Sequence, residues 1–76
     1  QGVDLIVSAG RFRLAVQIKG YVAGVGNEAV QQVHAGKTFH RCTEAAVVTN
    51  SAFTAAARQL AERVDCRLID DRLIPD

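Results

Sequence analysis

A glycine at position 10 separates two stretches whose residues alternate in the manner of β-strands. Residues 3–8 are rich in aliphatic and β-branched side chains, and in residues 12–19 apolar and polar positions alternate. Gly10 can adopt the positive φ that a two-residue hairpin turn needs at its first central position. With Gly10 in that position, Ala9 pairs with Phe12. This register decides which side chains share a face, because a slip of one residue turns every side chain over.

Continued along the hairpin, this register brings three polar side chains together. Asp4 falls opposite Gln17, and directly opposed residues have Cβ atoms roughly 4.5–5.5 Å apart. Lys19 lies two residues further and points to the same face. Mg²⁺ prefers oxygen ligands, which the Asp4 carboxylate, the Gln17 amide and the Ile18 carbonyl can supply. A cation and a lysine would stabilise the negative charge that grows when water attacks a phosphodiester.

The same residues can also serve a purely structural purpose. Asp4 can end a strand, and Gln17 and Lys19 can be solvated residues at the edge of a sheet. An aspartate followed by Gln-x-Lys is a short pattern that is common by chance. The spacing alone therefore leaves a metal site and an ordinary sheet edge both open.

Length and composition indicate one small globular domain. The chain has 76 residues, which is close to the lower limit for a self-sufficient core, and 49% of them are hydrophobic. A net charge of +1 neither argues for nucleic acid nor excludes a local basic patch. No apolar run approaches the roughly 18 residues of a membrane span, so we expect no membrane contact from this segment. Because the sequence contains no methionine, we expect an N-terminal segment or a larger protein beyond it.

Other ligand-binding patterns are weak. Cys42 and Cys66 occur without a secretory signal, which predicts reduced thiols and a cytoplasmic protein. His34, His40 and Cys42 match no standard zinc-finger spacing, and a fourth ligand is not evident. The glycine-rich residues 20–26 contain neither a Walker motif nor GxGxxG, which argues against a nucleotide site.

The middle of the chain predicts a helix and a buried strand. Asn27 can cap a helix over residues 28–37, and Val30 and Val33 would face the sheet. Residues 44–49 are a nearly continuous apolar run. Such a run is typical of a strand buried on both faces of a parallel sheet.

The clearest element is a second helix over residues 53–64, whose apolar side chains recur at i, i+3 and i+4. Asn50 or Ser51 can cap it, and residues 66–69 predict a last strand. The order strand, strand, helix, strand, helix, strand gives an α/β fold with a mixed four-stranded sheet flanked by helices. Two helices cannot easily cover both faces, so we expect a further helix before Gln1. Uncovered apolar surface also predicts a homo-oligomer.

Four stretches of the chain, in order, resemble the catalytic domain of the Mrr-like restriction endonucleases, within the PD-(D/E)xK nuclease superfamily. Together they cover nearly the whole sequence, which makes the likeness more specific than any one motif. They are residues 2–6 with Gly-x-Asp, residues 15–21 with Gln-x-Lys and a tyrosine, residues 47–57, and residues 68–73.

The resemblance implies a restriction-endonuclease-like core and a DNA endonuclease that depends on Mg²⁺ or Mn²⁺. Residues 1–76 would be its catalytic domain, incomplete at the N-terminus. Asp4 matches the metal-binding aspartate and Lys19 the catalytic lysine. Gln17 stands where most of the superfamily has glutamate or aspartate and this branch often has glutamine. Gln31 stands where the family often has a helical glutamine near the site.

Two departures from the family pattern support an alternative function. The acidic residue that many members carry on an upstream helix has no counterpart, and Gly20 replaces a usual basic residue. The chain would then be a non-catalytic DNA-binding or protein-interaction module that retains the nuclease fold. In either case the resemblance implies DNA as a partner and a companion domain outside this chain. Exposed Arg11, Arg13, Lys37 and Arg41 could contact phosphate or have no role.

Overall fold

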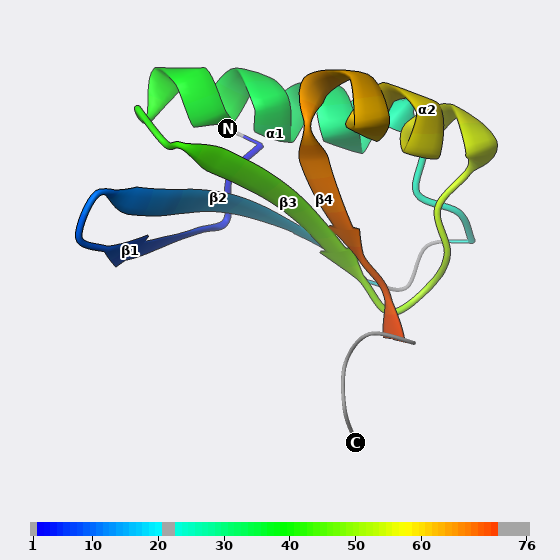
Figure 1. Cartoon of the computed structure of the whole chain (residues 1–76). Helices are drawn as coiled ribbons and strands as arrows, with labels where there is room; N and C mark the ends of the chain where they lie inside the picture. Colours follow the sequence, from blue (N-terminus) through cyan, green and yellow to red (C-terminus); the bar gives the residue numbers. More distant parts are fainter. Residues whose placement is uncertain (1, 21–22, 72–76) are drawn as a thin grey trace.

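The computed structural model describes residues 2–20 and 23–71 and shows an α/β fold in which a mixed four-stranded sheet carries two helices. Both helices lie on the same side of the sheet (Figure 1). In chain order the elements are β1 (Leu5–Ala9), β2 (Phe12–Lys19), α1 (Asn27–Phe39), β3 (Glu44–Thr49), α2 (Ala55–Val64) and β4 (Cys66–Ile69). The expected order of strands and helices is confirmed. Neither of these helices is long and apolar enough to cross a membrane.

The strands follow the order β1-β2-β3-β4 across the sheet. β1 and β2 form an antiparallel hairpin, whereas β2, β3 and β4 run parallel and are joined by crossovers through α1 and α2. Because parallel strands end at the same edge, Lys19 at the end of β2 lies beside Thr49 at the end of β3. Asp4, Gln17 and Lys19 lie toward this edge.

The hairpin has the register that the sequence predicts. Ala9 pairs with Phe12 and Leu5 with Val16, and Gly10 has a φ of 60°. A two-residue turn of this kind needs a positive φ at its first central position, which glycine adopts at little cost. The odd-numbered residues of β2, including Gln17, therefore face the helices.

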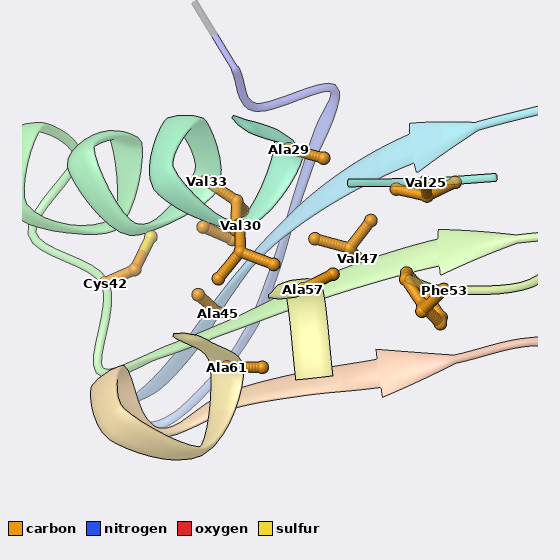
Figure 2. Packing of buried hydrophobic residues seen from close by; sticks show 11 residues of the cluster. Val25, Ala29, Val30, Val33, Cys42, Ala45, Val47, Phe53, Ala57 and Ala61 are labelled. Carbon is orange, nitrogen blue, oxygen red and sulfur yellow. The ribbon is translucent and has the colours of Figure 1, made fainter. Parts of the chain in front are cut away.

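The core lies between the sheet and the two helices, as Figure 2 shows. Val30 and Val33 on α1 are fully buried, and they pack over Val47 on β3. α2 contributes the small side chains of Ala57 and Ala61, which let its backbone approach the sheet closely. The apolar stripe expected on each helix thus faces the sheet.

The helix starts differ from the prediction. α2 begins at Ala55, and its cap is Thr54, whose Oγ1 accepts a hydrogen bond of 3.1 Å from the Ala57 amide. Phe53 does not continue the helix, because it forms a parallel bridge with Val25, which the sequence pattern did not reveal. Asn27 lies inside α1, and Gly26 occupies the cap position without a side-chain hydrogen bond.

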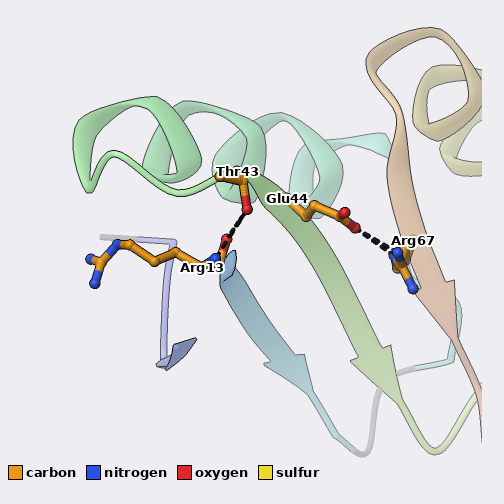
Figure 3. Close-up of polar contacts among 4 residues, drawn as sticks. All are labelled: Arg13, Thr43, Glu44 and Arg67. Carbon is orange, nitrogen blue, oxygen red and sulfur yellow. Dashed lines mark hydrogen bonds and ion pairs between the residues drawn. The ribbon is translucent and has the colours of Figure 1, made fainter. Parts of the chain in front are cut away.

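At the end of the sheet remote from Lys19, polar contacts link β2, β3 and β4 (Figure 3). Thr43 and Arg13 are joined by hydrogen bonds of 2.8–3.0 Å, so the start of β2 is tied to the entry of β3. The Arg67 guanidinium contacts Glu44 Oε1 at 2.6 Å through Nη2 and at 2.9 Å through Nε. Because this pair is exposed, we expect it to contribute at most about 1 kcal/mol.

The face of the sheet opposite the helices is apolar. Leu5, Val7, Phe12 and Ile18 are 49%, 44%, 38% and 55% exposed. None of the helices in the described part of the chain covers this face (Figure 1).

The partly buried thiol of Cys66 should make the free energy of unfolding fall at alkaline pH. Burial raises the pKa of its thiol from 9.0 to about 11, against a smaller opposing effect of Lys37. The folded chain therefore holds this proton more tightly than the unfolded chain. The contribution of Cys66 to stability should be constant below pH 9 and fall as the pH rises from 9 to about 11. Urea unfolding across this range should show a shallower fall for Cys66→Ala, and parallel curves for the two proteins would contradict the prediction.

Candidate active site

Gln17 is the buried polar residue of the site. Its side chain lies between the sheet and α1 and is only 4% exposed. Gln17 Nε2 donates a hydrogen bond of 2.9 Å to Gln32 Oε1 on α1. Gln17 Oε1 is buried and has no hydrogen-bond partner. A buried acceptor without a partner is unfavourable. This oxygen is therefore a strong candidate for coordinating a bound cation.

Asp4 is attached to β2 just beyond the regular ladder. Its backbone amide donates to the Val16 carbonyl at 2.8 Å, and its carboxylate Oδ2 accepts from the Ile18 amide at 2.8 Å. Within a strand, the N–H and C=O of one residue point to the same neighbour. The Ile18 carbonyl therefore points to the same side of β2 as the Asp4 carboxylate. A carboxylate has a second oxygen with which to bind a cation.

A pocket of about 460 Å³ opens beside Gln17 and Lys19, and Gly2, Gln32 and Ala35 complete its lining. The segment before β1 rises from the sheet to α1 (Figure 1), and its Gly2 lines the pocket. Gly2 has a φ of 72°, and a Cβ at this position would lie 2.7 Å from the Gln32 carbonyl oxygen. Glycine is therefore required here both by the backbone conformation and by the close approach to α1.

The structure brings most of the expected residues to one edge of the sheet. Asp4 and Gln17 are joined to neighbouring backbone and side-chain groups there, and Lys19 lines the same pocket. Gln31 is exposed, and the α1 glutamine that contacts Gln17 is its neighbour Gln32. The expectation that Gln31 faces the site is therefore corrected.

The reason lies in the rotation of α1. Its buried stripe consists of Ala29, Val30, Val33 and Gly36. At 3.6 residues per turn, Gln32 flanks this stripe on the side of Gly36, whereas Gln31 lies on the opposite side of the helix. The helical spacing alone could have favoured Gln32 once the stripe was defined.

The basic residues considered for phosphate contact lie at the other end of the sheet. Arg11 is in the hairpin turn, and Lys37 and Arg41 are near the end of α1. Arg13 is held within the molecule, because its guanidinium donates to Ser8 Oγ at 3.2 Å and to the His40 carbonyl at 3.1 Å. These residues therefore do not extend the pocket beside Lys19.

The donor set fits a hard cation. Within residues 2–20 and 23–71, no three histidine, cysteine, aspartate or glutamate residues cluster in a way that could hold a metal ion. The oxygens at this edge come instead from one carboxylate, one amide and one backbone carbonyl, those of Asp4, Gln17 and Ile18. Mg²⁺ commonly binds through one or two carboxylates and retains several waters, for which the pocket has room.

Gly2 offers a test of the geometry that does not depend on any activity. Gly2→Ala places a methyl group against Gln32 and forces a left-handed conformation on alanine. We expect a loss of about 1–3 kcal/mol in the free energy of unfolding. Gly20→Ala is the matched control, because a Cβ at Gly20 meets nothing within 4 Å. Equal stability of the two variants in urea unfolding would disprove the close approach.

Comparison with known proteins identifies the family. The family model Mrr_cat, described as a restriction endonuclease, matches residues 1–74. A crystal structure described as "Protein of Unknown Function AF1548" superimposes with a TM-score of 0.78 at 19% identity, over 97% of this chain and 42% of that one. At this identity the likeness shows the fold alone. No curated protein matches. The match over almost the whole sequence shows that the chain belongs to the Mrr family of restriction endonuclease catalytic domains.

Proposed function

We propose that this domain hydrolyses DNA phosphodiester bonds with the help of Mg²⁺ or Mn²⁺. Membership of a nuclease family supports the reaction class. The observation that carries the proposal is the unpartnered, buried Oε1 of Gln17 at the edge where Asp4 meets Ile18. If Gln17 Oε1 coordinated a metal ion, the buried oxygen would gain a partner, and an unfavourable feature of the fold would be removed.

Each residue has a role that its position allows. Asp4, Gln17 and the Ile18 carbonyl would hold the cation, which when bound makes water easier to deprotonate and offsets negative charge. Lys19 lies beside the same pocket, so its ammonium group can donate to a phosphate oxygen or orient the attacking water. Gln32, and not the expected Gln31, would be the helical glutamine near the site, because it accepts a hydrogen bond from Gln17.

Conservative substitutions should separate chemistry from folding. Asp4→Asn keeps an oxygen that can accept from the Ile18 amide but removes the charge, and Lys19→Met keeps the length of the side chain. We expect each to lower the rate of Mg²⁺-dependent cleavage of supercoiled plasmid DNA by about 10²–10³-fold. The full-length protein should be used for this measurement.

Matched controls remove the same charges elsewhere. Asp65→Asn acts at the left-handed residue that ends α2, with a φ of 59°, a conformation that asparagine tolerates. Lys37→Met acts in the last turn of α1. Both should cleave as the wild-type protein does. Equal cleavage by all five proteins would defeat the proposal.

A second candidate is a DNA-binding or interaction module without catalysis. It is favoured by Gly20, which stands where many family members have a basic residue. DNA binding that persists without any Mg²⁺-dependent turnover would support this candidate over the nuclease.

We further propose that the protein acts in the cytoplasm, with a companion domain that reads DNA, and that it forms homo-oligomers. The match covers 42% of the AF1548 chain, so in that protein the shared fold is accompanied by further chain. The apolar sheet face with Val7 and Ile18 supports the association of copies, because exposed patches of this kind tend to be buried by a partner.

A charge on this face should weaken self-association. Val7→Lys adds a lysine to an exposed apolar strand position, whereas Gln59→Lys adds one to the exposed side of α2. In sedimentation at high protein concentration, we expect the wild-type and Gln59→Lys proteins to associate and Val7→Lys to shift toward monomer. A wild-type protein that stays monomeric would contradict the proposal.

A further inference from the structure

The side-chain amide of Gln17 can take two orientations that differ chemically. One end is an acceptor oxygen and the other carries two N–H donors. Gln17 is 4% exposed, so water cannot satisfy whichever end is left without a protein partner. The contact that selects one orientation therefore also selects which end is available to a ligand.

In the structure Gln32 holds one of these two orientations. Its Oε1 accepts from Gln17 Nε2 at 2.9 Å and leaves Gln17 Oε1 without a partner. Gln32 is itself exposed, so its own Nε2 can be hydrated at little cost. The reversed pair would leave the two N–H groups of Gln17 as the unpartnered buried end. That end would repel a cation, whereas the observed end attracts one.

Gln32 also lies against the segment that carries Asp4. Gly2, two residues before Asp4, approaches the Gln32 backbone so closely that a Cβ would lie 2.7 Å from its carbonyl oxygen. The same helical residue thus contacts the strand that bears Gln17 and the segment that bears Asp4. It is placed to hold both oxygen donors relative to one another.

We propose that Gln32 is a positioning residue that holds the Gln17 amide with its oxygen presented to a divalent cation. The inference rests on the proposed function, since it assigns Gln17 Oε1 to the cation. A hydrogen-bond acceptor at position 32 should therefore be needed for cation binding. The rest of that side chain should not matter.

Three variants test the orientation. Gln32→Glu keeps an acceptor for Gln17 Nε2, Gln32→Leu removes it, and Gln31→Leu makes the same change on the exposed side of α1. We expect the Mn²⁺ dissociation constant, measured by electron paramagnetic resonance of the free ion, to rise about tenfold in Gln32→Leu, as loss of one buried hydrogen bond would produce. Gln32→Glu should bind Mn²⁺ at least as tightly as the wild type, and Gln31→Leu should not differ from it.

The Gln17→Glu background separates orientation from packing. Both ends of a carboxylate are oxygens, so no partner is needed to choose between them. In this background we expect Gln32→Leu to change the Mn²⁺ dissociation constant by less than about twofold. A tenfold loss in both backgrounds would mean that Gln32 acts through packing, and would overturn the inference.

A second measurement needs no metal. Solvent exchange of the Gln17 side-chain amide protons, followed by NMR, should be slow in the wild type and Gln32→Glu and faster in Gln32→Leu. Equal exchange in wild type and Gln32→Leu overturns the positioning role. So does Mn²⁺ binding that Asp4→Asn abolishes but Gln32→Leu leaves intact, and in that case the proposed function stands. If the wild type binds no Mn²⁺ and Asp4→Asn changes nothing, the proposed function and the inference fall together.

Discussion

The pairing of β2 with β1 fixes the orientation of every other group at the site. Leu5 opposite Val16 places the odd-numbered residues of β2 under the helices and the even-numbered ones on the open face. Gln17 is therefore buried against α1, while the backbone of the next residue is left for Asp4. A slip of one residue between β1 and β2 would send the Asp4 side chain to the face of the sheet opposite Gln17.

This part of the fold could be predicted because it depends on local chemistry. Gly10 selects a turn, the turn selects a register, and the register follows from alternation within a few residues. The bounds of Glu44–Thr49 were equally accessible, since a short apolar run between polar segments is typical of a buried strand and too short for most helices. Such features need no knowledge of which distant segments meet.

The errors arise where distant segments do meet. Phe53 fits the helical stripe of α2, yet it pairs with Val25, and the helix begins only after Thr54. Choosing Gln32 over Gln31 requires the rotation of α1 on the sheet, which its whole buried stripe determines. The role of Gly2 depends on a contact with residue 32, and a motif that names only glycine and aspartate does not reveal its cause.

A glutamine in place of a carboxylate at position 17 has a physical consequence for the family fold. At 4% exposure a second negative charge would lose most of its hydration, and without a cation it would be strongly destabilising. A neutral amide costs less to bury when the site holds no metal. The amide, however, has two unlike ends, so its orientation must be set by a neighbour, which a symmetric carboxylate does not require. In the proposed site, a hydrogen bond that depends on α1 replaces a charge that would depend on the cation, and this links the site to the packing of a helix.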